Sequence, residues 1–145
     1  MERCKTRTRF SRTISVSDAE TDRLGHTNNV KYLEWLEAIA WEHMDALGCP
    51  WETMEQENKA MAITHTEMQY LQATYAGDTL EIDTWISDSD QRLHSTRAFE
   101  IRKQGESQLI LKARMHFTCI NLANGKPARM PASFQAAFEK ALNGK

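Results

Sequence analysis

The sequence predicts an α+β protein in which one long helix packs against an antiparallel sheet. Three observations lead to this class: a long segment with helical periodicity near the N-terminus, several later segments in which apolar and polar residues alternate, and short polar turns between them. Short turns join antiparallel neighbours, and a helix that lies to one side of such a sheet defines the α+β class. The 145 residues contain no repeat or linker, so we expect one domain over residues 1–145.

The first predicted element is a strand over residues 9–17, where Phe10, Ile14 and Val16 share one parity. Residues 17–28 carry few large apolar side chains and include Gly25, which predicts a loop. This loop leads directly into the segment with helical periodicity.

A long helix is predicted over residues 29–47. Apolar residues recur there in two adjoining rows at spacings of three and four: Tyr32, Leu33, Trp35, Leu36, Ile39, Ala40, Met44 and Leu47. Polar side chains occupy only a narrow remainder of the circumference, so we expect other structure to enclose most of the helix. Gly48 and Pro50 end it, and residues 51–58 add a short helical turn.

Strands account for most of the remaining chain. Residues 60–73 form a long predicted strand whose apolar parity switches near residues 65–67, which indicates a bulge or a strong bend. Three further strands are predicted from alternation at residues 80–86, 96–101 and 109–119. Polar turns precede or separate them at residues 76–78, 87–91 and 104–106. After a last turn at residues 124–127, Pro131 opens a short amphipathic helix.

The composition narrows the classes of function. Hydrophobic residues make up 41% of the chain and charged residues 26%, as in a soluble globular protein. Acidic residues outnumber basic ones by 20 to 18, and the basic residues between Arg3 and Arg12 suit the approach to a strand, so we expect no nucleic-acid partner. We also expect no membrane partner, because no apolar run reaches the roughly 18 residues of a membrane span. The first residues lack the apolar segment of a signal peptide, and the three widely spaced cysteines argue against a disulfide framework, so we expect a cytoplasmic protein.

Several kinds of catalytic site have no signature in the sequence. The five histidines do not form a His-Glu-x-x-His motif and no two cysteines have Cys-x-x-Cys spacing, so we expect no metal. A Gly-x-Ser-x-Gly nucleophile motif is absent, and the glycines are too scattered to form a phosphate-binding loop. We therefore expect no cofactor.

The most informative segment runs from Asp22 to Tyr32. It places a carboxylate, an imidazole, two amides and a glycine directly before the long helix. A carboxylate near the free N–H groups of a helix start is suited to a reaction that develops an oxyanion. The alternative interpretation is a polar loop capped by Asn28 or Asn29, since asparagine is a favoured N-cap residue.

This segment resembles the signature of a known family. It reads Asp22-Arg-Leu-Gly-His26-Thr-Asn28-Asn29-Val-Lys-Tyr32, and it is similar to the motif of hotdog-fold thioesterases of the 4-hydroxybenzoyl-CoA thioesterase type and, further away, of plant acyl-ACP thioesterases. A weaker resemblance covers nearly the whole chain, including Gly77 to Leu80 and Gly125 to Pro127. The resemblance implies the hotdog fold, in which a curved antiparallel sheet wraps around a long central helix.

The resemblance also implies roles for individual residues. Asp22 matches the catalytic carboxylate, as nucleophile or general base, and Asn29 matches the position whose backbone N–H polarises the thioester carbonyl. His26 would hydrogen-bond the substrate or orient Asp22, or simply order the loop. The implied substrate-binding residues are Tyr32, Met68 and Arg92, the last of them for the phosphates of coenzyme A, with Arg97 and Lys126 as weaker candidates.

Two departures from the family pattern refine the expected function. Glu20 stands where the family often has the first aspartate of an Asp-x-Asp pair, and Leu24 stands where the plant enzymes keep an asparagine. The second departure favours the acyl-CoA type, so we expect a thioesterase that hydrolyses an acyl-CoA. The alternatives are an acyl-ACP thioesterase and a non-catalytic acyl-CoA-binding hotdog dimer, and Glu67 is a minor alternative for the acid. The family pairs two sheets edge to edge, which implies a homodimer, possibly a homotetramer, with its sites between subunits.

Overall fold

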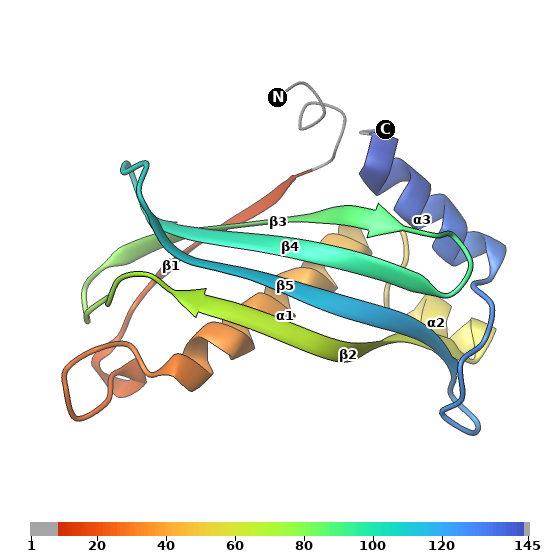
Figure 1. Cartoon of the computed structure of the whole chain (residues 1–145), viewed down its shortest axis with the longest axis horizontal. Helices are drawn as coiled ribbons and strands as arrows, with labels where there is room; N and C mark the ends of the chain where they lie inside the picture. Colours follow the sequence, from red (N-terminus) through yellow and green to blue (C-terminus); the bar gives the residue numbers. More distant parts are fainter. Residues whose placement is uncertain (1–8, 144–145) are drawn as a thin grey trace.

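The computed structural model describes residues 9–143. Its five strands form one antiparallel sheet in the order β1-β3-β4-β5-β2, which curves around a long helix, α1 (Figure 1). The strands are β1 (Phe10–Ser15), β2 (Lys59–Tyr70), β3 (Thr79–Ser89), β4 (His94–Lys103) and β5 (Leu109–Asn121). The predicted α+β class and the antiparallel sheet are thus confirmed. Cys4 and the basic residues Arg3, Lys5 and Arg7 lie outside the described residues.

The three α-helices lie where periodicity and turn residues predict them, and a short 3₁₀ turn falls in the segment predicted as a loop. These elements are the 3₁₀ turn η2 (Asp18–Glu20), α1 (Asn29–Ala46), α2 (Trp51–Glu57) and α3 (Ala132–Asn143). Asn28 is the N-cap of α1, and its side-chain oxygen accepts a hydrogen bond from the backbone N–H of Val30 at 3.0 Å. At the other end of α1, Gly48 has a φ of +88°, a left-handed conformation that glycine adopts without strain.

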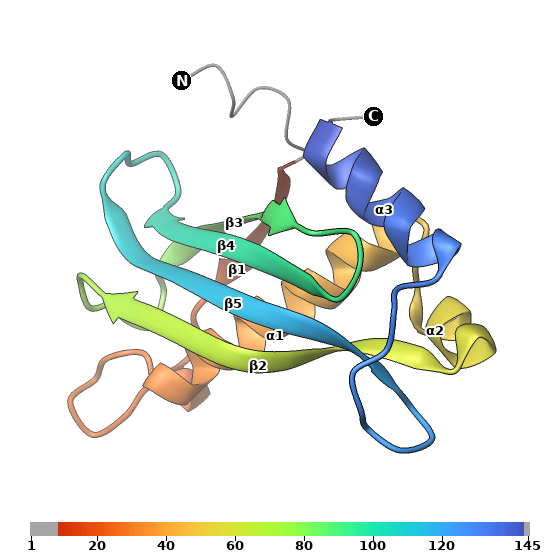
Figure 2. The ribbon, with the colours of Figure 1, turned by 45° about the vertical axis from the view of Figure 1, so that its right-hand side comes forward.

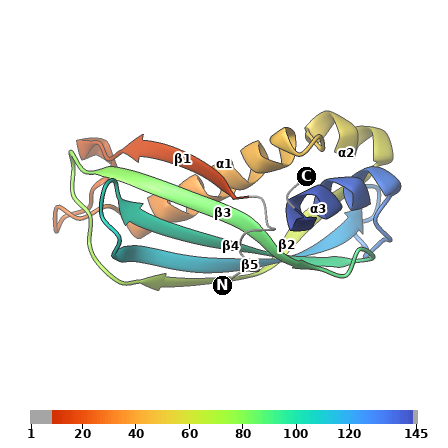
Figure 3. The ribbon, with the colours of Figure 1, turned by 90° about the horizontal axis from the view of Figure 1, so that it is seen from above.

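Helix α1 is less enclosed than the sequence predicts. Leu36, Ile39 and Ala40 are buried against the sheet, but the side opposite them is open: Trp41 remains 45% exposed and Glu37 is also exposed. Seen from above, α1 and α2 lie together on one side of β3, β4 and β5, and β1 curls back toward α1 (Figure 3). Within a single subunit, the wide apolar arc is therefore covered on one side only.

The core has two parts along α1. The first lies between the N-terminal half of α1 and the middle of the sheet and includes Tyr32, Leu36, Ile39, Leu80, Ile82, Phe99, Ile101 and Leu111. The second joins the end of α1 to α2, α3 and one end of the sheet and includes Met44, Met54, Ile86, Cys119, Phe134 and Phe138. Figure 2 shows α2 and α3 gathered at that end. Because burying each large apolar side chain contributes roughly 1.5–3 kcal/mol, both ends of α1 are firmly held.

Strand β2 forms one edge of the sheet. It pairs with β5, and the register shifts between Ile63 and His65, which confirms the predicted bulge. Most side chains from Ile63 to Tyr70 are exposed. Strand β3 extends to Ser89, so it includes part of the segment predicted as a turn. Within residues 9–143, none of the helices combines the length and the apolar character needed to cross a membrane.

Candidate active site

The segment before α1 folds back on itself as a short hairpin. Thr21 forms an isolated bridge with Thr27, and the backbone N–H of Asn28 donates to the carbonyl of Glu20 at 2.8 Å. At the tip, the N–H of Asp22 donates to the carbonyl of His26, also at 2.8 Å. The hairpin therefore holds Asp22 beside the chain that enters α1, as the resemblance implies.

The carboxylate of Asp22 is held by one oxygen only. Its Oδ1 accepts hydrogen bonds from the backbone N–H groups of Leu24, at 2.9 Å, and His26, at 3.3 Å. Its Oδ2 accepts none from the described residues, and the residue is exposed. Gly25 adopts a φ of +80° at this turn, so glycine is needed for the conformation that directs both amides at Oδ1. One carboxylate oxygen is fixed and the other is available to a ligand.

The start of α1 supplies one free N–H group in the segment that follows this hairpin. The first N–H groups of a helix have no acceptor within the helix. The N–H of Val30 is satisfied by the Asn28 side chain and that of Lys31 by the Asn28 carbonyl, whereas the N–H of Asn29 has no partner among residues 9–143. The capping interpretation is therefore right for Asn28, and it leaves the Asn29 N–H available.

A buried polar cluster anchors the hairpin to the rest of the protein. The hydroxyls of Thr27 and Thr74 are 2.5 Å apart, and the hydroxyl of Tyr32 lies 2.7 Å from that of Thr74. The ring of His26 packs edge-on against Tyr75, 5.1 Å away, and does not hydrogen-bond to Asp22. His26 thus contacts Asp22 through its backbone. Thr74 was missed by sequence reasoning, because it is 47 residues from Thr27 and no local pattern links the two.

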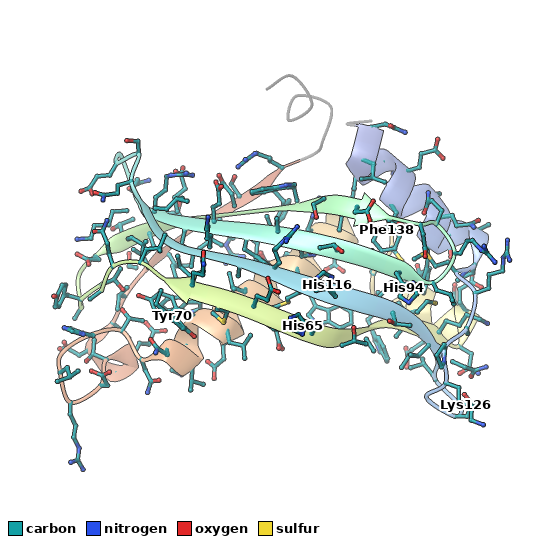
Figure 4. The ribbon with its side chains drawn as sticks, viewed as in Figure 1. His65, Tyr70, His94, His116, Lys126 and Phe138 are labelled. Atoms are coloured by element: carbon teal, nitrogen blue, oxygen red, sulfur yellow. The ribbon has the colours of Figure 1, made fainter. Side chains whose placement is uncertain are left out.

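The predicted substrate-binding residues fall into two places. Tyr32 lies 5.9 Å from the ring of Tyr70, whose hydroxyl is 3.5 Å from the sulfur of Met68, so Tyr32 and Met68 are close to the hairpin. Arg92 is exposed in the turn after β3, at the opposite end of this 11-residue strand. That separation is roughly 30 Å at the rise of a β-strand. Tyr70 and Lys126 mark these two ends of the sheet in Figure 4.

Two weaker candidates are corrected by the structure. Arg97, predicted as a solvated base or a phosphate contact, is only 2% exposed and lies inside the protein. Glu67 lies beside His65 on β2, at 3.3 Å, and is exposed. Because side chains alternate along a strand, it points away from the face on which Met68 packs against the core. Glu67 therefore does not approach the hairpin.

The thiols in the described residues are not suited to nucleophilic catalysis. Cys49 and Cys119 are buried in the second part of the core. Burial, with a smaller contribution from Glu57, raises the pKa of Cys49 to about 11, and burial also raises the pKa of Cys119. Among residues 9–143, no group of three or more His, Cys, Asp or Glu side chains is arranged to hold a metal ion.

A pocket opens on the other half of α1. Its cavity volume is about 80 Å³, or about 530 Å³ when the open mouth is counted, and it lies between α1, α2, α3 and the inner face of the sheet. Most of its lining is apolar: Ala40, Trp41, Met44, Met54, Met61, Ile63, Ile86, Phe117 and Phe138. The polar lining residues are Glu37 on α1 and Ser95 and Arg97 on β4.

Arg97 is bound to a buried histidine behind this pocket. Its Nη1 lies 2.8 Å from Nδ1 of His43 and 3.2 Å from Oγ1 of Thr84. Since a guanidinium can only donate, His43 accepts at Nδ1 and carries its proton on Nε2, which is buried without a partner among the described residues. Burial first, and the charge of Arg97 second, lower the pKa of His43 to about 3. The ring is neutral at neutral pH.

The architecture and the hairpin define a class of protein. A long helix held in a curved five-stranded antiparallel sheet is the hotdog fold, and it carries a carboxylate beside the helix start. The protein SAV2348 from Staphylococcus aureus, solved in complex with CoA, superposes with a TM-score of 0.86 at 16% identity, covering 94% of this chain and 85% of that one.

Sequence comparisons then place the chain in a family. The model of the thioesterase-like superfamily matches residues 16–138. The acyl-CoA thioesterase YbgC of Haemophilus influenzae is 26% identical over 130 residues, covering 89% of this chain and 93% of that protein. The long-chain acyl-CoA thioesterase FadM of Escherichia coli is 23% identical over 127 residues, covering 88% and 95%. This chain belongs to the thioesterase-like superfamily.

Proposed function

We propose that this protein hydrolyses an acyl-CoA to the free acid and CoA, with Asp22 as the catalytic carboxylate and the Asn29 N–H as the oxyanion donor. The observation that carries the proposal is the hairpin: one oxygen of Asp22 is fixed by two amides, the other accepts no hydrogen bond from the described residues, and the same segment leads into the unpaired N–H of Asn29. The activities named for YbgC and FadM support an acyl-CoA substrate.

Two routes use the same groups. In the first, Asp22 removes a proton from water, and the resulting hydroxide adds to the carbonyl carbon while the Asn29 N–H stabilises the oxyanion. The intermediate then expels the CoA thiolate, which takes up a proton. In the second, the carboxylate itself attacks and releases the thiolate, and water hydrolyses the mixed anhydride. In either route one such donor lowers the barrier by roughly 2.7–4 kcal/mol.

The supporting residues have positioning roles in this proposal. His26 holds Oδ1 of Asp22 through its backbone N–H. Tyr32 is buried in the core beneath the hairpin, with its hydroxyl on Thr74, and Met68 packs against that core. A cytoplasmic location is part of the proposal, because free buried thiols at Cys49 and Cys119 suit a reducing compartment.

The first test is a panel of thioesters, measured as thiol released by the wild-type protein. Acyl-CoAs of increasing chain length, aromatic acyl-CoAs and matched acyl carrier protein thioesters form its arms. Preferential turnover of acyl-CoAs supports the proposal. Preferential turnover of carrier-protein thioesters identifies the acyl-ACP alternative, and tight binding of acyl-CoA without turnover of any thioester identifies the non-catalytic one.

Strand β2 supports a homodimer. It is a 12-residue edge strand, and an edge of this length with exposed apolar side chains such as Ile63 and Tyr70 is suited to pairing with another strand. Two copies related by a two-fold axis would pair β2 with itself in antiparallel fashion. The C-terminal end of one β2, near the hairpin, then lies beside the N-terminal half of the other, near the pocket. A tetramer would need a further interface.

This pairing would also bring Arg92 back to the site. In the dimer, the turn after β3 of the second subunit lies at the same end of the joined sheet as the first subunit's hairpin. Arg92 of the second subunit therefore stays a candidate contact for the phosphates of CoA.

A substitution on β2 tests the dimer. Ile63→Lys places a charge on the proposed interface, where it would be desolvated next to its symmetry copy, so we expect a monomer in sedimentation analysis and a thioesterase rate at least about tenfold lower. Leu122→Lys is the matched control, because Leu122 is similarly exposed but lies on the loop after β5. A dimer that survives Ile63→Lys, or a wild-type protein that sediments as a monomer, would contradict this interface.

A further inference from the structure

Arg97 is a buried cation without a counter-ion in the described chain. Its side chain projects from β4 to the inner face of the sheet, and no carboxylate of residues 9–143 lies within 4.0 Å of its guanidinium. The guanidinium donates hydrogen bonds to two neutral residues, His43 and Thr84. Burial lowers the pKa of Arg97 to about 9, so the group still carries its charge at neutral pH. A buried charge is normally paired, which makes this arginine an exception that calls for a ligand.

The unpaired cation faces a pocket. Arg97 and Ser95 are neighbours on the inner face of β4, and both line the pocket beside α1. Ser95 is only 3% exposed, and its hydroxyl makes no hydrogen bond to any described residue. A guanidinium and a free hydroxyl therefore present hydrogen-bond donors together at the inner wall of an otherwise apolar pocket.

The acid that lines this pocket does not neutralise the arginine. Glu37 lies on α1, is exposed, and is not within 4.0 Å of Arg97. The rest of the lining is apolar apart from Ser95 and includes Met44, Met61 and Phe117. The pocket thus has apolar walls, and its inner end carries two hydrogen-bond donors, the charged guanidinium of Arg97 and the neutral hydroxyl of Ser95.

We propose that this pocket binds the acyl group of the substrate and that Arg97 and Ser95 select acyl chains that end in a carboxylate. The apolar walls accommodate the methylene chain, and the terminal carboxylate accepts hydrogen bonds from the guanidinium and the Ser95 hydroxyl. An acyl chain with a methyl end would cover the same walls but would remove water from Arg97 without replacing it by an acceptor, which is unfavourable. The substrate class is therefore an ω-carboxyacyl-CoA.

The position of the pocket fits this role in the proposed dimer. Within one subunit the pocket begins at Glu37, roughly 12 Å along α1 from Asn29 at the rise of an α-helix. In a dimer built on β2, Ile63 at the pocket lies close to the two-fold axis, and the pocket of one subunit faces the hairpin of the other. The inference rests on the proposed thioesterase function and names the substrate class of that same site.

The test compares three CoA thioesters of equal chain length, namely octanoyl-CoA, 8-hydroxyoctanoyl-CoA and suberoyl-CoA, together with shorter and longer members of each series. We expect the wild type to favour the ω-carboxy compound over the methyl-ended one about tenfold to a hundredfold in kcat/KM at the best length. In Arg97→Met the ratio of the two kcat/KM values is expected to fall to about one, and in Ser95→Ala it is expected to fall severalfold. Arg114→Met, which removes an exposed arginine of β5, is the matched control and is expected to leave the ratio unchanged.

Binding separates this inference from the thioesterase proposal. The thioether analogues S-(7-carboxyheptyl)-CoA and S-octyl-CoA cannot be hydrolysed, and their affinities are measured by calorimetry with folded wild type, Ser95→Ala and Arg97→Met. Preference for the carboxylate analogue that is lost in the variants supports the inference even if no thioester is turned over. Equal affinities in the wild type, or equal rates for the hydroxy and carboxy thioesters, would overturn it. If Arg97→Met does not fold, Ser95→Ala and the wild-type ratio still decide the question.

Discussion

Replacing Asp22 by asparagine is expected to lower kcat/KM for the best acyl-CoA by roughly 10²- to 10⁴-fold. The amide can still accept hydrogen bonds from Leu24 and His26 through one oxygen, so the hairpin is expected to keep its shape. What is lost is the free carboxylate oxygen, which in the proposed mechanism either removes a proton from water or attacks the carbonyl. Because the change leaves the pocket untouched, the affinity for a non-hydrolysable analogue is expected to stay within about threefold, and the loss should fall on kcat.

A nearby acid, Asp18, provides the control for Asp22→Asn. Asp18→Asn removes an exposed carboxylate four positions earlier, on η2, and should leave the rate unchanged. Equal rates for the wild type and Asp22→Asn would show that Asp22 is not the catalytic carboxylate. In the wild type, a burst of thiol equal to the enzyme concentration would identify the nucleophilic route.

The second large effect concerns stability in acid. The pKa of His43 is about 3 in the folded protein and about 6.5 in an unfolded chain, so the unfolded chain binds the proton more readily. The neutral ring therefore contributes stability that is fully present above pH 6.5 and is lost as the pH falls toward 3. The loss approaches about 1.4 kcal/mol per pH unit and reaches up to about 5 kcal/mol in total.

Chemical denaturation between pH 6.5 and 5 measures this effect, because carboxylates remain ionised over most of that range. His43→Gln keeps an acceptor for Arg97 but cannot titrate, so its free energy of unfolding is expected to depend less steeply on pH than that of the wild type. The exposed His65→Gln is the control and should retain the wild-type slope. Parallel curves for the wild type and His43→Gln would show that His43 does not become charged on unfolding.

The order of elements was predictable because it depends on local patterns. Alternation placed four strands, the spacing of apolar residues placed α1, and the parity change near His65 located the bulge. Periodicity reports which residues are apolar but not what covers them, so it overstated how much of α1 is enclosed within one subunit. The exposed ring of Trp41 is the visible result.

The hairpin before α1 was predictable from local sequence, and the environment of the buried Arg97 was not. Asp22 and Asn29 lie in one continuous segment, so their proximity could be read from the chain. Arg97 shares the parity of Phe99 and Ile101, which does indicate an inward side chain, but an arginine was expected in solvent. Its partner His43 lies 54 residues away on α1, a contact that only the folded chain reveals.

The hairpin lies near the C-terminal end of β2 and the pocket on its N-terminal half, and in a dimer built on that strand this separation has a genetic consequence. Each catalytic centre would draw its carboxylate from one polypeptide and its acyl pocket from the other. A subunit with a defective hairpin and a subunit with a defective pocket, each inactive alone, would together form a mixed dimer with one intact centre. Alleles of this gene would then complement one another. A substitution of Asp22 would inactivate the centre whose acyl pocket, with Arg97, belongs to the neighbouring subunit.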